Sequence, residues 1–191
     1  MINISKMSKY YGEYPAVIDV SFNISKGESI GLLGPNGAGK STTMKVMTGY
    51  TPPTSGNVNI GGYDIIKNSI DARKLIGYLP ESVPLYTDMT VKEYLSYMGS
   101  LRGMGKNILN RVDEVIDLTS LNQYKNVLIS KLSKGYRQRT GIAQAILHKP
   151  KILILDEPTI GIDPVQVVET RKLIQNLGEE HTLILSSHIL P

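Results

Sequence analysis

The stretch GPNGAGKS, residues 34 to 41, has the residue types and the spacing of a loop that holds phosphate groups. Its glycines let backbone N–H groups curl around phosphate oxygens, and the helix that follows adds the positive end of its dipole. Lys40 would reach the β- and γ-phosphates, Ser41 would place its hydroxyl on Mg²⁺, and Thr42 would touch the α-phosphate. The residues expected to bind the nucleotide here are Gly34, Pro35, Asn36, Gly37, Ala38, Gly39, Lys40, Ser41 and Thr42.

Two adjacent carboxylates, Asp156 and Glu157, follow the apolar run ILIL. A buried strand that ends in two acids delivers both of them to the C-terminal edge of a parallel sheet, where α/β proteins bind their ligands. Asp156 is placed to hold Mg²⁺ through water, and Glu157 to orient and deprotonate an attacking water. The alternative is a pair of solvated loop acids, and the phosphate loop upstream favours the catalytic interpretation.

A second helix start with the features of an anion site lies at LSKGYRQR, residues 132 to 139. Ser133 stands in the N-cap position, and Gly135 follows it at the head of an amphipathic helix. The free N–H groups and the dipole of such a helix favour an anion. Taken alone, the stretch is better explained by a serine that only caps its own helix.

Strands and helices alternate along the chain in an order that would bring these residues together. Patterns of apolar residues between turn residues predict strands at residues 1–12, 16–25, 27–34, 73–81, 151–158 and 181–188. The strand at 27–34 is expected to be buried. Helical spacing predicts helices at residues 39–50, 90–104, 107–121, 132–149 and 164–178. A turn at Gly12–Pro15 joins the first two strands, Gly49 ends the first helix, and a capping box from Thr90 to Glu93 opens the second. This alternation indicates an α/β fold with a parallel sheet covered on both faces.

The length and composition limit the classes of function. The 191 residues are enough for one domain with a real core and short for two. No apolar run approaches the roughly 20 residues that span a bilayer, no signal peptide is evident, and the absence of cysteine removes thiolate chemistry. The net charge of +4 comes from scattered lysines and arginines, so a solvated surface is favoured and no nucleic-acid partner is expected.

Taken together, the motifs resemble those of ATP-binding cassette (ABC) ATPases in their order and spacing. The stretch LSKGY resembles the family's signature sequence LSGGQ, GPNGAGKST its Walker A motif, and ILILDEP its Walker B motif with the catalytic glutamate. The residues GID, ending at Asp163, are similar to the D-loop, and SSH, ending at His188, resembles the switch-histidine motif. Tyr11 matches the position that stacks on adenine, although a packing role is the alternative for it.

The resemblance implies a fold and a mode of action. The expected fold is an α/β P-loop NTPase of the ABC type: a mostly parallel sheet, a small antiparallel β subdomain and a helical subdomain at about residues 82–149. Two such domains, expected to be copies of one chain, would pack head to tail around two ATP molecules, with Ser133, Gly135 and Asp163 contacting nucleotide across the interface. Glu157 would be the base for ATP hydrolysis with Mg²⁺, and His188 would hold the γ-phosphate and the water.

The resemblance also implies a membrane partner. The stretch from Ser82 to Leu101 would dock on a coupling helix of a separate integral membrane permease, at the cytoplasmic face of the cell membrane. The signature variant Lys-Gly-Tyr-Arg is similar to the ATP-binding proteins of ABC-2-type exporters, among them gliding-motility, multidrug and sodium-efflux relatives. A soluble ABC ATPase acting on ribosomes or DNA is the alternative, as is a nucleotide-binding regulatory module without turnover.

Two further departures from the family pattern matter. Most relatives carry glutamine where this chain has Glu81, in the loop that senses Mg²⁺. Glu81 still offers an oxygen to Mg²⁺ or to the attacking water, and a surface acid at a strand end is the alternative. The family normally continues with at least two strands and a helix beyond the position of Pro191, so residues 1–191 are expected to form one ABC domain that is incomplete at its C-terminus.

Overall fold

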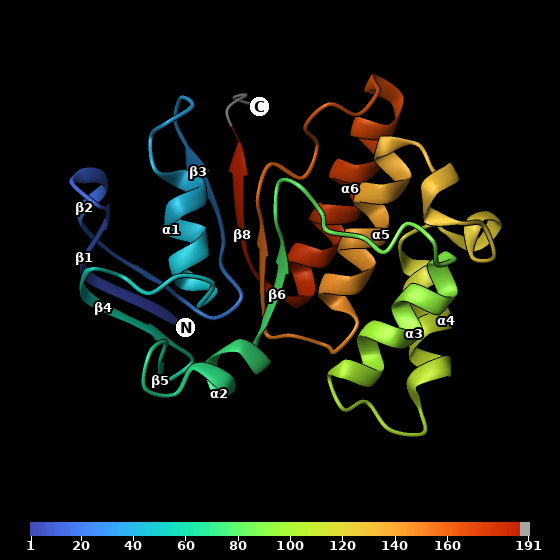
Figure 1. The fold of residues 1–191 in the computed structure, drawn as a ribbon, viewed down its shortest axis with the longest axis horizontal. Coiled ribbons are helices and arrows are strands. Elements are labelled where there is room, and N and C mark those ends of the chain that lie inside the picture. The colour runs from blue at the N-terminus through green and yellow to red at the C-terminus, as the bar shows by residue number, and fades with distance from the viewer. Residues whose placement is uncertain (188–191) are drawn as a thin grey trace.

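Two four-stranded sheets organise the chain in the computed structural model, which describes residues 1–187 (Figure 1). The antiparallel sheet has the order β2-β1-β4-β5. Its strands are β1 (Ile2–Tyr11), β2 (Tyr14–Ile24), β4 (Ser55–Ile60) and β5 (Tyr63–Asp64). The predicted turn joins β1 to β2 at Gly12, whose φ of +61° is a conformation that glycine adopts without strain.

The second sheet is parallel and has the order β3-β8-β7-β6. Its strands are β3 (Ser29–Leu33), β6 (Ile76–Leu79), β7 (Ile152–Leu155) and β8 (Thr182–Ser187). Leu79 is paired with Leu155, and Leu155 with Leu185, so the C-terminal ends of these strands lie level. The residues that follow β7 therefore emerge beside the end of β8.

The side chains of β7 point alternately to the two faces of the parallel sheet, and they are buried on both faces. Ile152 and Ile154 pack into a core shared with the antiparallel sheet and helix α1 (Lys40–Met47). Leu153 and Leu155 point the other way, into a core formed largely by the helices of the second half of the fold. A strand covered on both sides reads as a continuous apolar run, and ILIL is such a run.

The remaining helices lie beside and beyond the parallel sheet (Figure 1). They are α2 (Ser69–Lys74), α3 (Val91–Leu101), α4 (Ile108–Leu118), α5 (Lys134–Ile146) and α6 (Pro164–Glu180), with short 3-10 turns at Asn122–Tyr124 and Ile129–Lys131. The predicted capping box at α3 is present, with Thr90 and Glu93 bonded to each other's backbone N–H groups. No helix within residues 1–187 combines the length and the hydrophobicity needed to cross a membrane.

Glycines let α5 rest directly on β6. A methyl group at Gly77 of β6 would overlap the carbonyl oxygen of Ala145 in α5. Further along the same contact, a methyl group at Gly141 of α5 would fall 2.8 Å from Cγ1 of Val83, inside normal contact distance. At Gly77 the backbones of β6 and α5 therefore meet directly, and at Gly141 the helix backbone rests on a side chain.

Two details of the predicted elements are wrong. Strand β3 is not buried along its length, because among the described residues it pairs only with β8 and lies at the edge of the sheet; Ser29, Gly31 and Leu33 are exposed. Arg73 and Lys74 belong to helix α2 and not to the strand predicted at residues 73–81. That helix has six residues, which is too short to show a helical period in the sequence.

Candidate functional site

The phosphate-loop sequence lies between the end of β3 and the start of α1, as its motif requires. Gly34, Gly37 and Gly39 all have positive φ, so the loop turns through conformations that disfavour other residues. At Gly39, φ is +83°, and an added Cβ would fall 2.7 Å from the carbonyl oxygen of Ala16. The backbone of β2 thus fixes the exit of the loop at a distance that only glycine permits.

The start of helix α1 is open to an anion. Gly39 is its N-cap residue, and among the described residues no side chain caps it and no acid stands in its first turn. The first helical bond is donated by the N–H of Thr43 to the carbonyl of Gly39, so the N–H groups of Lys40, Ser41 and Thr42 precede the helical ladder. Uncapped N–H groups and the positive end of the dipole fit a phosphate group.

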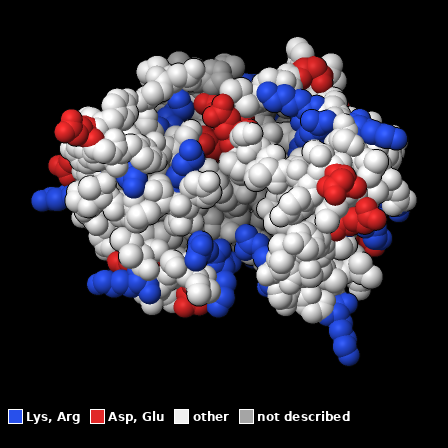
Figure 2. Space-filling model, in the orientation of Figure 1, with Lys and Arg blue, Asp and Glu red and all other residues white. Residues whose placement is uncertain are grey.

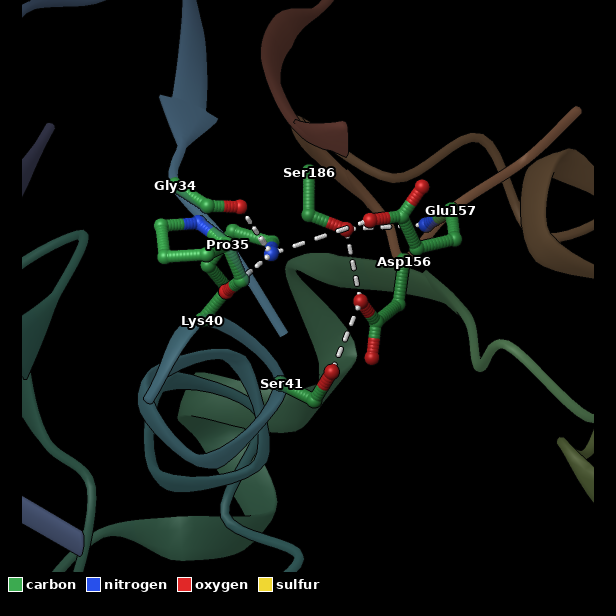
Figure 3. A network of polar contacts seen from close by, with 7 residues as sticks. All are labelled: Gly34, Pro35, Lys40, Ser41, Asp156, Glu157 and Ser186. Carbon is green, nitrogen blue, oxygen red and sulfur yellow. Dashed lines mark hydrogen bonds and ion pairs between the residues drawn. The ribbon is translucent and has the colours of Figure 1, made fainter. Parts of the chain in front are cut away.

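The amino group of Lys40 is folded back over the loop (Figure 3). Its Nζ donates to the carbonyl oxygens of Gly34 at 2.6 Å and Pro35 at 3.1 Å, and lies 3.9 Å from Oε1 of Glu157. The Lys40 and Glu157 side chains are about nine-tenths buried, so this cation and this carboxylate face each other with little water between them. This position of the amino group, over the phosphate loop, suits the binding of an anion by the loop.

Ser186 on β8 links the two acids to each other, and Ser41 links Asp156 to the phosphate loop (Figure 3). Oγ of Ser41 donates to Oδ1 of Asp156 at 3.1 Å, and Oγ of Ser186 donates to the same oxygen at 2.6 Å. The backbone N–H of Glu157 donates to Oγ of Ser186 at 2.8 Å. Mg²⁺ prefers oxygen ligands such as a hydroxyl and a carboxylate. The neighbouring oxygens of Ser41 and Asp156 therefore fit that ion.

Glu157 is held in an unusual backbone conformation. Its φ is +47°, in the left-handed region that costs a non-glycine residue of order 1–3 kcal/mol. The residue is also buried, and Asp156 beside it is 1% exposed. Strain of this kind persists where the surrounding bonds impose it, here the bond from the Glu157 N–H to Ser186 and the Ile160 N–H bond to the Glu157 carbonyl.

Part of the phosphate loop and Glu157 line one cleft of about 370 Å³. Its walls carry the loop residues 36–42 together with Tyr11, Tyr14, Glu81 and Glu157. The amino group of Lys9 lies 5.2 Å from the centre of the Tyr11 ring, a cation–π contact on that ring. The fold therefore brings Tyr11, Glu81 and Glu157 to the phosphate loop from three separate parts of the chain.

The second helix start is placed elsewhere, since Ser133, Gly135 and Asp163 do not line this cleft. Ser133 is exposed and caps α5, its Oγ accepting a long bond of 3.4 Å from the N–H of Tyr136. Asp163 caps α6 by accepting from the N–H of Gln166 at 3.0 Å. Ser133 and Asp163 thus each cap their own helix. Within one chain, the second predicted anion site lies apart from the phosphate loop. His188 lies outside the described residues.

Sequence reasoning missed three residues of the site. Ser186 links both acids, yet only its place two residues before His188 marked it. Tyr14 lines the cleft beside Tyr11, in the residues predicted to be a turn. Tyr78 lies on β6 with a buried hydroxyl that has no hydrogen-bond partner among residues 1–187, and burial, followed by the charge of Asp156, raises its pKa above the usual value.

A larger cleft of about 1000 Å³ opens between the two halves of the molecule. Figure 2 shows this hollow with lysine and arginine side chains on both of its sides. Five cations and one acid line it, namely Arg73, Lys74, Arg102, Arg111, Lys149 and Glu114. The chain has 21 basic and 17 acidic side chains, so 16 of each sign lie outside this cleft and balance one another. The net charge of +4 is therefore concentrated in the cleft.

Comparison with known proteins decides the family. The family model described as "ABC transporter" matches residues 17–160. The chain belongs to the ABC transporter family. A bacitracin transport ATP-binding protein of Bacillus licheniformis and a linearmycin resistance ATP-binding protein of Bacillus subtilis are each 39% identical to it over its full length. This ABC chain spans 62% of the length of each of these two relatives.

Solved structures of ABC proteins show the same fold. The ATP-binding subunit of an ABC transporter superposes on the whole chain with a TM-score of 0.86 at 30% identity, and the chain covers 80% of it. A dimeric ATP-binding cassette in a post-hydrolysis state, bound to ADP and Pi, matches 99% of the chain with a TM-score of 0.87 at 26% identity, and 88% of that structure is covered. The α/β fold of the ABC type, with a parallel and an antiparallel sheet, is therefore confirmed.

Proposed function

We propose that this ABC chain is the ATP-binding and ATP-hydrolysing subunit of a transporter of the ABC-2 exporter type. The observation that carries the proposal is the bonded group in which Lys40 and Ser41 of the loop meet Glu157 and Asp156 across the ends of β3 and β7. Two relatives that match the whole chain are named for bacitracin transport and linearmycin resistance, which supports an export role.

The roles of the residues follow from their positions. The loop N–H groups and Lys40 bind the β- and γ-phosphates, and Tyr11 stacks on adenine. Ser41 and Asp156 hold Mg²⁺, which neutralises phosphate charge when it is bound, and Glu81 offers it a further oxygen. Glu157 accepts the proton of the attacking water, since its carboxylate lines the cleft beside the phosphate loop. The switch-histidine motif gives His188, which lies outside the described residues, the role of holding the γ-phosphate.

A second copy of the chain completes each site. Ser133 and Gly135 lie at the head of α5, away from the cleft of their own chain, so they serve the nucleotide of a partner. Asp163 joins the same interface through the loop that it caps. The dimeric neighbour bound to ADP and Pi supports this arrangement.

The membrane partner docks on residues 82–101, within the helical block at residues 82–149. On and beside α3, the rings of Tyr86, Tyr94 and Tyr97 pack edge to face at centroid distances of 5.7 to 6.0 Å. Tyr86 is 48% exposed and Tyr97 is 39% exposed, which leaves an aromatic surface suited to a helix of a permease. Arg102, at the end of α3, lines the basic cleft. The partner segment is therefore acidic as well as apolar, because it meets these positive charges. The complex lies at the cytoplasmic face of the membrane.

The substitution Glu157→Gln in the full-length protein tests the hydrolytic role. It preserves the shape of the side chain and removes the base, so steady-state phosphate release should fall by about 10²–10⁴-fold. Binding of ATP with Mg²⁺ and ATP-driven dimerisation should persist, because Lys40 and Ser41 are unchanged. A variant that releases phosphate at the wild-type rate would refute the assignment of Glu157.

A further inference from the structure

Ser133 and Gly135 form the second predicted anion site, the second grip, and its Gly135 is covered by a side chain from α6. The residue is buried, whereas Ser133 two positions earlier is exposed. A methyl group at Gly135 would overlap Oε1 of Gln166 and would fall 2.7 Å from its Cδ. The amide group of Gln166 therefore lies flat against the backbone that is expected to receive the partner's phosphate.

The contact is reciprocal. Lys134, next to Gly135, extends its side chain over Gly161 in the loop that precedes α6. A methyl group at Gly161 would overlap the lysine amino group and would lie 3.3 Å from its Cε. Each segment thus contributes one glycine and one long side chain, and the heads of α5 and α6 are interlocked through two pairs of residues. Gln166 is held in this position at its backbone by the Asp163 cap.

The covering oxygen is itself unsatisfied. Oε1 of Gln166 is buried and has no hydrogen-bond partner among the described residues. A buried carbonyl oxygen without a donor destabilises the state that contains it. The positive end of the α5 dipole partly offsets that cost, since the head of a helix attracts an oxygen that carries negative charge. Oε1 of Gln166 therefore occupies, beside Gly135, the kind of environment that suits a phosphate oxygen.

We propose that Gln166 sets the ATP concentration at which the second grip engages: its amide covers Gly135 until the γ-phosphate of the partner's ATP displaces it. This inference rests on the proposed head-to-tail ATPase. The phosphate offers several oxygens and a full negative charge, so it replaces a neutral amide that makes no hydrogen bond through Oε1. Gln166 is thus a positioning residue for the binding step, and it does not take part in hydrolysis.

Two substitutions of Gln166 should act in opposite directions. Gln166→Ala removes the cover, and Gln166→Leu keeps a cover of similar length while removing the unsatisfied oxygen. In the full-length protein carrying Glu157→Gln, the ATP concentration for half-maximal dimerisation should fall about three- to tenfold with alanine and rise by a similar factor with leucine. Sedimentation velocity across an ATP titration measures both shifts. The exposed neighbour Val165, changed to alanine, is the matched control and should leave the midpoint unchanged.

A second readout separates this role from a structural one. Binding of a fluorescent ATP analogue to the dilute monomer should be the same in all variants, because the phosphate loop is untouched. A rise in the dimerisation midpoint with alanine would show that Gln166 is a ligand and would overturn the proposal, as would equal midpoints for alanine and leucine. Failure of the parent protein to dimerise with ATP would overturn the proposed function itself, and it would appear before any Gln166 variant is compared.

Discussion

Ser186 and Asp156 are joined by a hydrogen bond of 2.6 Å between the serine hydroxyl and Oδ1 of the carboxylate. The same hydroxyl accepts the N–H of Glu157, so one buried side chain on β8 orients both acids that follow β7. Neither acid is oriented by its own strand alone, because both lie beyond the last paired residue, Leu155. Outer partners of this kind set the direction of a metal-binding carboxylate.

The substitution Ser186→Ala should therefore weaken Mg²⁺ use. Loss of the donor to Asp156 should raise the Mg²⁺ concentration for half-maximal ATPase activity by about tenfold, since removing such outer partners commonly costs 10- to 100-fold. Ser21→Ala is a matched control, because the Ser21 hydroxyl also accepts a backbone N–H at 2.8 Å but does so on β2. An unchanged Mg²⁺ requirement in Ser186→Ala would contradict the prediction.

The phosphate loop offers a comparison of two glycines with the same φ of +83°. At Gly37 an added Cβ would meet nothing within 4 Å, whereas at Gly39 it would meet Ala16 and Val17. Gly37→Ala should lower the free energy of unfolding by about 1–2 kcal/mol, from left-handed strain alone. Gly39→Ala should cost about 1–3 kcal/mol more, because β2 or the loop must also move. Urea denaturation measures both, and equal losses would show that β2 does not constrain the loop.

Charge in the large cleft should control the attachment of the membrane subunit. The guanidinium group of Arg102 lines this cleft and makes no hydrogen bond or ion pair within residues 1–187, so Arg102→Glu changes the charge of the cleft and leaves the backbone bond from Arg102 to Gly99 in place. Co-purification of the permease with the tagged full-length protein should fall severalfold, more steeply at low salt. Lys26→Glu, an equal reversal of charge at an exposed site outside that cleft, should leave it unaffected. Recovery of ribosomes in place of a permease would contradict the transporter assignment.

Acid should destabilise the fold through His148. Its Nε2 lies 3.0 Å from the carbonyl oxygen of Ile76, and burial, followed by the charge of Arg102, lowers the pKa of the ring to about 4. The unfolded chain binds this proton near pH 6.5, so stability is full above that pH and is lost as the pH falls towards 4. The loss should stay below about 1.4 kcal/mol per pH unit, because solvent screens the accessible part of the ring.

The variant His148→Gln tests this origin, because a glutamine amide can still donate to Ile76 and does not titrate. The decrease in unfolding free energy between pH 7 and pH 5 should be smaller in this variant than in the wild type. The same substitution at His181, which bonds the carbonyl of Pro150 through Nδ1, is the control. Equal pH dependence in wild type and His148→Gln would show that another group is responsible.

The parts of the site that are contiguous in the chain were predictable from the sequence. The phosphate loop and the acid pair are each short motifs with a strand beside them, and ILIL alone indicates a strand covered on both faces. The capping box at Thr90 was equally visible, because Thr90 and Glu93 are three residues apart. Local chemistry of this kind needs no knowledge of which strands pair.

The parts of the site that depend on which strands and helices lie side by side were not predictable from the sequence. Ser186 meets Asp156 because β8 lies beside β7 in a register that pairs Leu155 with Leu185, and no local pattern specifies that register. Exposure of β3 follows from its place at the sheet edge, although its sequence resembles that of a buried strand. Gln166 was missed for the same reason, since its contact with Gly135 joins two helix heads 31 residues apart in the chain.

The glycine contact between β6 and α5 fixes the distance between that helix and the parallel sheet. Gly77 brings the backbone of α5 against β6, and β6 is bonded to β7, which Asp156 follows directly. The contact is made at Ala145, near the end of α5, and β6 pairs with β7 through main-chain bonds, so main-chain atoms alone set the distance between this end of the helix and the strand that leads to the acid pair. One methyl group at Gly77 would increase that distance, whereas at Gly141 the helix already rests on the side chains of Leu79 and Val83.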